Sequence, residues 1–490
     1  MVLLALVALT LQTPSTPAAR PARRQTPAPA ALVTRALDAI GGAEAVRAIP
    51  ALTFEYYQST FGLGQEETPG SPARPTIITG RVTTDWRGAR RSHTNETRGI
   101  NGQLTRTRRI TVNDIGLVET GTAGPQPDQP GPVLNALRVM RTTPERLLLA
   151  ASEHADGLTA LPAAEWRGDM ADGVHYVNGP DTLNLFFDRI SGLLLGVEQV
   201  TDDPILGDRH AATMYTRWQE TGGVKFPRQV DVAVNDRLQS NTVITSVAIG
   251  AAPDSLFVIP DSIASKAPHA TPGAPPPLLP LTLVELAPGV WRAEGGTHFS
   301  LVVEQSTQIV VVEAPLNAAR TTALLDTLRS RFPRKPVSVV VNTHHHWDHS
   351  GGLRAAMAAG IPIVTQRRNL AYVRGIGSAR KTIAPDILSR VKRSPVVRAM
   401  DDTLTIGAGD SRVVIYRLPT THVEGMLAAY VPAARLLFTS DVLTPGPTLA
   451  PLGSTEIAAF ARARGIAIER VAGGHGGIAS WPDVERAAGN

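Results

Sequence analysis

Asn342–Gly352 reads NTHHHWDHSGG and places four histidines and one aspartate within six residues. The whole chain of 490 residues has only 12 histidines, so this short segment holds a third of them. It follows VSVVV, a β-branched run that predicts a buried strand, and loops at strand ends are where α/β proteins bind ligands. Imidazole and carboxylate groups without thiolates suit zinc, iron or manganese. The segment therefore predicts a metal-binding loop.

The spacing of these side chains indicates how they divide between metals. His344 and His346 are two residues apart and can point the same way from a loop, whereas Asp348 and His349 can face the other side. Two local ligands do not complete a tetrahedral site, so later loops must supply more. Three candidate ligands lie near the ends of predicted strands: His422, Asp441 and His475. Glycines flank the last of them.

Thr343–Gly352, THHHWDHSGG, resembles the THxHxDHxGG signature of the metallo-β-lactamase-fold hydrolases. The later ligands of that family match in order, as a His after a strand, an Asp in a segment like FTGD (here FTSD) and a His in GHG. The resemblance covers about 282–490. It implies one metal held by His344, His346 and His422, a second held by Asp348, His349 and His475, and Asp441 bridging both. The implied cofactor is two zinc ions per chain, with iron or manganese as alternatives.

Several residues depart from the pattern of this family. Thr421 precedes His422 where Gly or Ala is commoner, Ser440 replaces the usual Gly before the bridging Asp, and Glu313 stands where a strand-end Asp is usual. The chain has no cysteine, which excludes the lactamase subclasses with a cysteine ligand. His345 lies between two ligands and is expected to pack rather than to bind metal.

The resemblance implies a hydrolase in which two metals lower the pKa of a water between them. Asp348 is the expected catalytic residue, because it can orient the nucleophile and pass a proton to the leaving group. The expected substrate is a small ester, lactone, amide or thioester. Two alternatives stay open: a periplasmic binding or scaffold protein with a structural metal domain, and a di-iron redox member of the family.

Substrate contacts are harder to predict, and two candidates stand out. His298 lies in a loop, GGTHFS, that could border the site, and Arg367 begins a segment, 367–398, with nine Lys or Arg residues. That segment predicts either a lid that captures an anionic group or a solvated helical face.

A proline-rich stretch divides the chain. Ala267–Pro280 has six prolines, which do not fit a helix or a central strand, and it predicts a linker over 261–281. Beyond it, at 282–490, strands alternate with helices such as Ala318–Arg331, and the resemblance implies an α/β sandwich with helix–sheet–sheet–helix layers.

The part before the linker, 31–260, has a different pattern. Runs such as 182–190 and 193–200 pair through short turns, which predicts a mainly antiparallel β domain. One or two helices are expected in it, and the helical patterns lie at 31–49 and 134–154. This pattern resembles the half-barrel of lipoprotein carriers. We expect the domain to bind an apolar ligand or a partner.

Composition and the N-terminus bear on partners and location. The net charge of +5 comes without a long Lys/Arg run, so we expect a small-molecule substrate and no nucleic acid. Met1–Leu11 is an apolar run too short to span a bilayer, and small residues follow it. We therefore expect a signal peptide at 1–19, a Pro/Arg-rich tether at 20–30, no integral membrane span, and a periplasmic or secreted protein.

Overall fold

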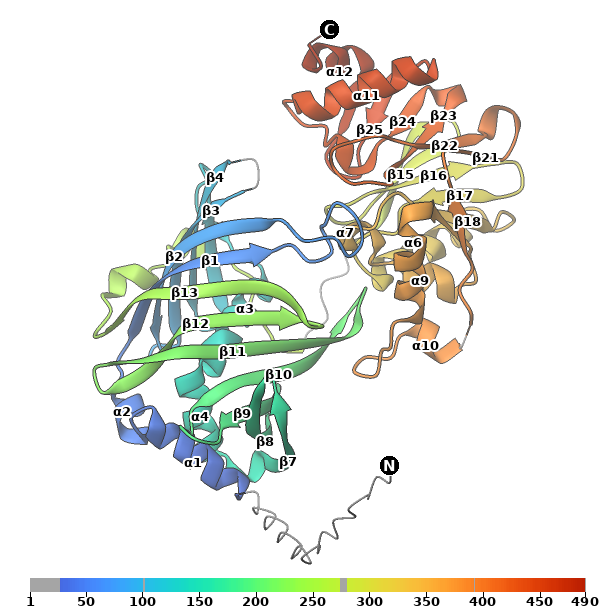
Figure 1. Cartoon of the computed structure of the whole chain (residues 1–490). Coiled ribbons are helices and arrows are strands. Elements are labelled where there is room, and N and C mark those ends of the chain that lie inside the picture. Colours follow the sequence, from blue (N-terminus) through green and yellow to red (C-terminus); the bar gives the residue numbers. More distant parts are fainter. Residues whose placement is uncertain (1–26, 100–101, 274–279, 392, 490) are drawn as a thin grey trace, which may run out of the picture.

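The computed structural model of the chain describes residues 27–99, 102–273, 280–391 and 393–489 (Figure 1). The signal peptide expected at 1–19 and most of the tether expected at 20–30 lie outside the described residues, as does part of the linker. Within the described residues, no helix is both long and apolar enough to cross a membrane.

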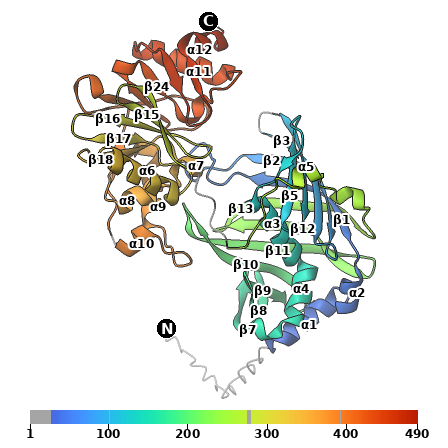
Figure 2. The same cartoon turned by 180° about the vertical axis from the view of Figure 1, so that it is seen from behind.

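The first half of the chain forms one antiparallel sheet of thirteen strands, in the order β6-β5-β4-β3-β2-β1-β13-β12-β11-β10-β9-β8-β7. The predicted class of this half, mainly antiparallel β with few helices, is confirmed. The sheet curves around α3 and α4, which lie against one of its faces (Figure 2). The strands are β1 Leu52–Phe61, β2 Pro75–Asp85, β3 Arg90–Arg98, β4 Leu104–Val112, β5 Ile115–Thr120, β6 Gln126–Pro127, β7 Leu158–Trp166, β8 Asp169–Asn178, β9 Asp181–Asp188, β10 Leu194–Asp203, β11 Gly207–Thr221, β12 Val224–Val234 and β13 Arg237–Ile249.

The helices of this half are α1 Pro29–Ala39, α2 Ala43–Ala48, α3 Pro130–Thr142, α4 Pro144–Glu153 and the short α5 Asp261–Ala264. Each of the two helices that the sequence predicts is split in two. The first breaks at Gly41 and Gly42, whose φ angles of +126° and +88° suit glycine and end α1. The second breaks where Thr143 is extended before Pro144, because proline disfavours the helical conformation of the preceding residue.

The second half of the chain contains two stacked sheets. One has seven strands in the order β14 to β20, and the other has six in the order β21 to β26. Their bounds are β14 Thr282–Ala287, β15 Val290–Glu294, β16 Ser300–Glu304, β17 Ile309–Val312, β18 Val337–Asn342, β19 Ile363–Gln366, β20 Val397–Met400, β21 Thr403–Ile406, β22 Val413–Arg417, β23 Leu427–Val431, β24 Leu436–Phe438, β25 Arg470–Ala472 and β26 Ile478–Ser480.

One strand shows how the layers pack. In β17 the side chains of Val310 and Val312 join a core shared with the six-stranded sheet, whereas Ile309 and Val311 face a second core under helices. Successive side chains of a strand point to opposite faces, so an unbroken apolar run is buried on both sides.

Helices cover the two outer faces. On the seven-stranded sheet they are α6 Ala318–Arg331, α8 Leu353–Ala358, α9 Leu370–Ser378 and α10 Ile387–Val391. On the six-stranded sheet they are α11 Pro451–Arg464 and α12 Trp481–Ala487. The predicted αββα sandwich is therefore confirmed, and α6 begins and ends at the predicted residues.

Within the described residues, the two halves of the chain touch at the β1–β2 loop and at the β10–β11 turn. The β1–β2 loop reaches α7, Trp347–Ser350, where Trp347 N donates to Gly64 O at 3.3 Å (Figure 1). At the β10–β11 turn, Asp208 N donates to Arg380 O at 2.7 Å, and Lys381 pairs with Asp202. Part of the basic segment 367–398 thus packs against the first half of the chain.

Candidate metal centre

The histidine-rich loop begins where β18 ends, and buried polar contacts fix its course. Asn342, the last residue of the strand, donates from Nδ2 to His344 O at 2.7 Å and to Ser350 Oγ at 3.0 Å. A side chain at Gly352 would overlap Thr321 Oγ1 of α6, so the glycine allows the loop to turn closely against that helix. The loop is consequently held from both sides before any ligand is considered.

The structure brings together one group of ligand atoms from three segments. His344 and His346 from the loop, His422 after β22, and Asp441 after β24 each offer one atom, and these atoms lie within 4.8 Å of one another. Asp441 Oδ2 is 3.4 Å from His422 Nε2 and 3.8 Å from His344 Nε2. Zinc ligands at about 2.0–2.1 Å in tetrahedral geometry lie about 3.3 Å apart, so the spacing suits one metal ion.

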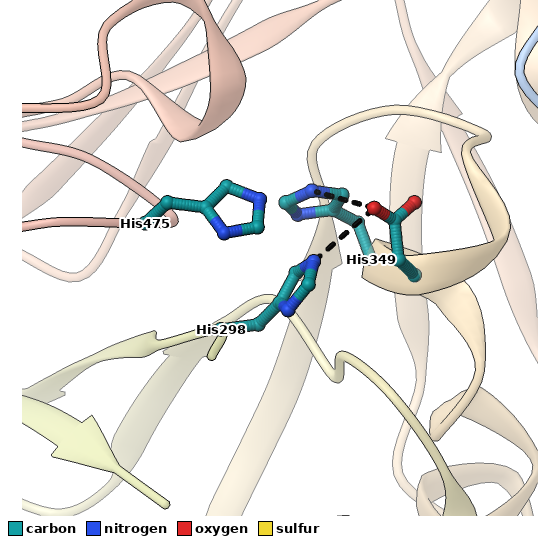
Figure 3. Close-up of side chains that lie close together, drawn as sticks. His298, His349 and His475 are labelled. Carbon is teal, nitrogen blue, oxygen red and sulfur yellow. Dashed lines mark hydrogen bonds and ion pairs between the residues drawn. The ribbon is translucent and has the colours of Figure 1, made fainter. Parts of the chain in front are cut away.

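A second group lies on the other side of Asp441. It contains Asp348, His349 and His475, together with His298. Asp441 Oδ1 is 2.9 Å from His349 Nε2 and 3.1 Å from His475 Nε2. Figure 3 shows His298, His349 and His475 converging from three separate segments. Asp441 therefore turns one carboxylate oxygen toward each group, which is the arrangement of a bridging ligand.

Unpartnered atoms test whether these residues fit metal ions. Among the described residues, five buried atoms at the centre of the two groups have no well-oriented hydrogen bond, although His349 Nε2 and Asp441 Oδ1 face each other at 2.9 Å: His344 Nε2, His346 Nδ1, His349 Nε2, His422 Nε2 and Asp441 Oδ1. Buried polar atoms without a partner are costly and rare. Their convergence on two shared positions fits a pair of cations.

The opposite ring nitrogens are anchored, as is usual for histidines that bind metals. His346 Nε2 donates to Glu66 O at 3.1 Å, His349 Nδ1 to Glu313 Oε2 at 2.9 Å and His475 Nδ1 to Thr297 O at 3.1 Å. Each contact fixes which nitrogen of the ring faces the centre. His346 presents Nδ1 there, whereas His349 and His475 present Nε2.

Two departures from the family pattern contact each other. Ser440 Oγ donates to Glu313 Oε1, which also accepts from Thr343 Oγ1 at 2.7 Å. Ser440 has a φ of +52° and Glu313 a φ of +73°. Both values belong to the left-handed region, which favours glycine. This preference explains why glycine is common at the position of Ser440. The Ser440 hydroxyl gives Glu313 a buried partner, so the two departures are complementary.

The charges of the groups shape their pKa values. Burial opposes ionisation of Asp441, yet the facing His349, His422 and His475 rings hold the pKa of its carboxyl far below the usual range. Burial also opposes a charge on His349, but Glu313 and Asp441 raise its pKa well above the ordinary value. Burial lowers the pKa of His346 to about 4. At neutral pH His346 is therefore ready to bind a cation, whereas His349 must first lose a proton.

His298 lies within the second group of ligand atoms, not merely at its border. Its Nε2 is 3.1 Å from Asp348 Oδ2, and its ring centroid is 3.8 Å from that of His475 (Figure 3). Arg320 of α6 donates to His298 O and to Ala293 O, both at 3.0 Å, and so holds the loop that carries this ring. The sequence singled out His298 as a bordering residue, and the structure places it against Asp348.

The first half of the chain contributes residues that sequence reasoning missed. Gln65, in the β1–β2 loop, donates from Nε2 to Asp348 Oδ1 at 2.7 Å, and Glu66 supplies the carbonyl that anchors His346. Glu66 itself is buried and pairs with Arg237 at 2.6 Å. No local pattern marks Gln65 or Glu66, because the contact depends on how the two halves pack.

The remaining candidates lie apart from the two groups. The buried His345 ring stands edge-on to Tyr372 at 5.7 Å and belongs to neither group. Arg367, a candidate substrate contact, instead pairs with Asp401 through two hydrogen bonds of 2.5 and 2.8 Å at the surface. The structure therefore places Arg367 in a surface ion pair and not at the histidine cluster.

The family match covers part of the second half of the chain. Residues 293–475 match the family model of the metallo-beta-lactamase superfamily. Among solved structures, the metallo-beta-lactamase from Pontibacter korlensis is 18% identical, with coverage of 43% of this chain and 98% of that chain and a TM-score of 0.34. The metallo-beta-lactamase from Hirschia baltica is 19% identical, with coverage of 43% and 96% and a TM-score of 0.33.

A curated relative matches over a shorter stretch. The 2,4-dinitroanisole O-demethylase subunit alpha of Nocardioides sp. (strain JS1661) is 26% identical over 160 residues, which span 32% of this chain and 45% of that relative. The match thus covers less than half of the relative. Together with the sandwich fold and the ordered His/Asp groups, the family match shows that residues 293–475 of this chain are similar to the metallo-β-lactamase superfamily.

Proposed function

We propose that the chain is an exported hydrolase with two zinc ions, acting on a small ester, lactone, amide or thioester. The observation that carries the proposal is the position of Asp441, whose two oxygens face two separate groups of ligand atoms. In the first group the partners are histidines, and in the second they are histidines and one further aspartate. Nitrogen and oxygen ligands of this kind suit zinc.

Two metal ions bound here would supply Lewis acidity and a water acidic enough to attack a carbonyl carbon at neutral pH. The chain supplies the proton transfers. Asp348 faces the second group and has a pKa of about 2, because hydrogen bonds from His298 and Gln65 and the charge of His349 outweigh the effect of burial. An ionised Asp348 can orient the attacking water and then carry its proton to the leaving group.

The accessibility of the centre favours catalysis over a purely structural role. His344 and His349 are fully buried, but the side chains of His422 and His475 are 31% and 25% exposed. A structural zinc site is normally closed to solvent, whereas a catalytic site keeps a position open to water or substrate. An edge that opens beside His422 and His475 gives a substrate a path to the centre.

The test is a hydrolysis screen on zinc-loaded protein with chromogenic esters, lactones and a cephalosporin. The name of the curated relative adds 2,4-dinitroanisole as one further probe. We expect turnover of at least one ester or lactone, and loss of that turnover in Asp441→Asn. A matched control is Asp326→Asn, which changes an aspartate on the surface of α6 that pairs with Arg329.

The other outcomes separate the alternatives. Zinc-loaded, folded protein that turns over none of these compounds would favour a binding protein with a structural metal domain. Retained hydrolysis in Asp441→Asn would contradict the bridging role. Protein that is purified with iron and is active only in redox assays would favour a di-iron enzyme.

A further inference from the structure

A cavity in the N-terminal half of the chain has no part in the metal centre. It lies between α3, α4 and one face of β1 and β9 to β13, and its volume is about 710 Å³. Sites for small molecules typically range over roughly 300–1,000 Å³. α3 and α4 lie against the curved face of the sheet (Figure 2), and residues of both helices line the cavity together with the strands.

The lining of this cavity is apolar over most of its area. Alternate residues of the strands line it, as the two-residue period of a strand requires. They are mostly aliphatic or aromatic, and they include Leu52, Leu183, Val197, Tyr215, Phe226 and Val232. Such a lining favours a hydrocarbon chain over a polar metabolite.

Two arginines lie together at one rim of the cavity. Arg138 of α3 donates to Gln199 Oε1 at 3.3 Å, and Arg209 of β11 donates to Gln239 Oε1 at 3.1 Å. Thr201 pairs with Arg209 across β10 and β11, only two residues from Gln199, so both guanidinium groups reach the same rim. Arg138 also donates to Asn135 Oδ1 at 3.3 Å, so within the described part of the chain the side-chain partners of both arginines are neutral amides.

The acidic residues of the cavity are occupied elsewhere. Asp181 pairs with Arg141 at 3.1 Å, and Glu145 accepts a hydrogen bond from Thr143 Oγ1 at 2.6 Å. Burial raises the pKa of Glu145, which favours its neutral form. The rim therefore carries two cations that no carboxylate of the cavity neutralises.

From the apolar interior and the cationic rim, we infer that this cavity binds a single-chain anionic amphiphile of the fatty-acid class. The hydrocarbon chain lies against the strands, and the carboxylate meets Arg138 and Arg209 in place of their amide partners. Guanidinium groups suit carboxylates because both can form paired hydrogen bonds. This inference goes beyond the proposed hydrolase and does not depend on it.

The rim also faces the other half of the chain. Two residues beyond Thr201, Asp203 O accepts a hydrogen bond from Lys381 Nζ at 3.0 Å, and Asp208 contacts Thr382. An occupied cavity would thus place its charged end near the contact between the two halves. None of the cavity-lining residues belongs to the metal centre.

The test is isothermal titration of the full, zinc-loaded chain with decanoate, and with 1-decanol as the neutral match. We expect decanoate to bind at least about tenfold more tightly than 1-decanol, as a hydrogen bond to a charged group predicts. Octanoate should bind about 15-fold more weakly than decanoate, because each buried methylene contributes about fourfold. The double variant Arg138→Gln/Arg209→Gln should remove the preference for decanoate.

A cavity-filling variant supplies the second arm. Ala211→Trp places an indole inside the cavity and should abolish binding of both compounds. His210→Trp, one residue earlier on β11 and exposed, is the control and should bind like the parent. Absence of binding in the parent, or unchanged binding in both the filled variant and the double arginine variant, would overturn the inference. Equal affinity for decanoate and 1-decanol would overturn its anionic part.

Discussion

Replacing Glu313 by glutamine tests how the metal ligands are held. The Glu313 side chain is fully buried, and its Oε2 accepts the Nδ1 proton of His349 at 2.9 Å. Glu313→Gln keeps the size of the side chain and its bonds from Thr343 and Ser440, if the amide oxygen faces them. The amide nitrogen then meets His349 Nδ1, so that two donors face each other.

The magnitude follows from the one contact that is lost. A hydrogen bond to a charged group contributes about 1.5–3 kcal/mol, and changing a partner of a metal-binding histidine typically weakens the metal about 10- to 100-fold. We expect the weakening to fall on the second metal, which His349 binds. The first metal, held by His344, His346 and His422, should be weakened less, because none of these three side chains forms a hydrogen bond with Glu313.

The assay is zinc competition against a chelator of known affinity, with metal-free protein that circular dichroism shows to be folded. Glu469→Gln is the control, because Glu469 lies at the surface and pairs with Arg435. If folded Glu313→Gln retains both zinc affinities, the contact with His349 does not organise the site. An equal loss at both metals would contradict the division into two groups.

Three further outcomes are expected. Gln65→Ala should lower kcat/KM about tenfold at unchanged zinc content, because one hydrogen bond to Asp348 is lost; an unchanged kcat/KM would refute a role for the β1–β2 loop. Zinc binding near neutral pH should release protons and tighten as pH rises, because His349 and His475 have raised pKa values in the metal-free protein and must give up those protons. Calorimetric heats of zinc binding that are identical in buffers of different ionisation enthalpy would contradict this proton release. Arg320→Ala should lower the free energy of unfolding in urea by about 2–4 kcal/mol, because buried carbonyls lose their donor, whereas a change below about 0.5 kcal/mol would show that the loop does not need it.

Much of the grouping of the candidate ligands could be predicted from the sequence because these residues lie near strand ends. His344 and His346 follow a β-branched run, and the two-residue spacing already indicates a shared side. His422, Asp441 and His475 each stand near the end of a short strand, so the layers of the sandwich bring them to one edge. The structure gathers all of them into two groups around Asp441.

What the sequence did not predict depends on packing between distant segments. Gln65 contacts Asp348, 283 residues away, and nothing in its neighbours marks it. Glu313 was only a departure from a pattern until its contacts with His349 and Ser440 placed it at the site. The helix expected at 134–154 is two helices, because the restraint that Pro144 places on Thr143 outweighs the apolar periodicity around it.

The most direct measurement is the metal content of the purified, zinc-supplied chain beside Asp441→Ala and His346→Ala. We expect about two zinc ions per parent chain, a marked loss of both in Asp441→Ala, and loss of mainly the first in His346→Ala. One zinc ion in the folded parent, or two in Asp441→Ala, would contradict a centre in which this aspartate joins two metal sites.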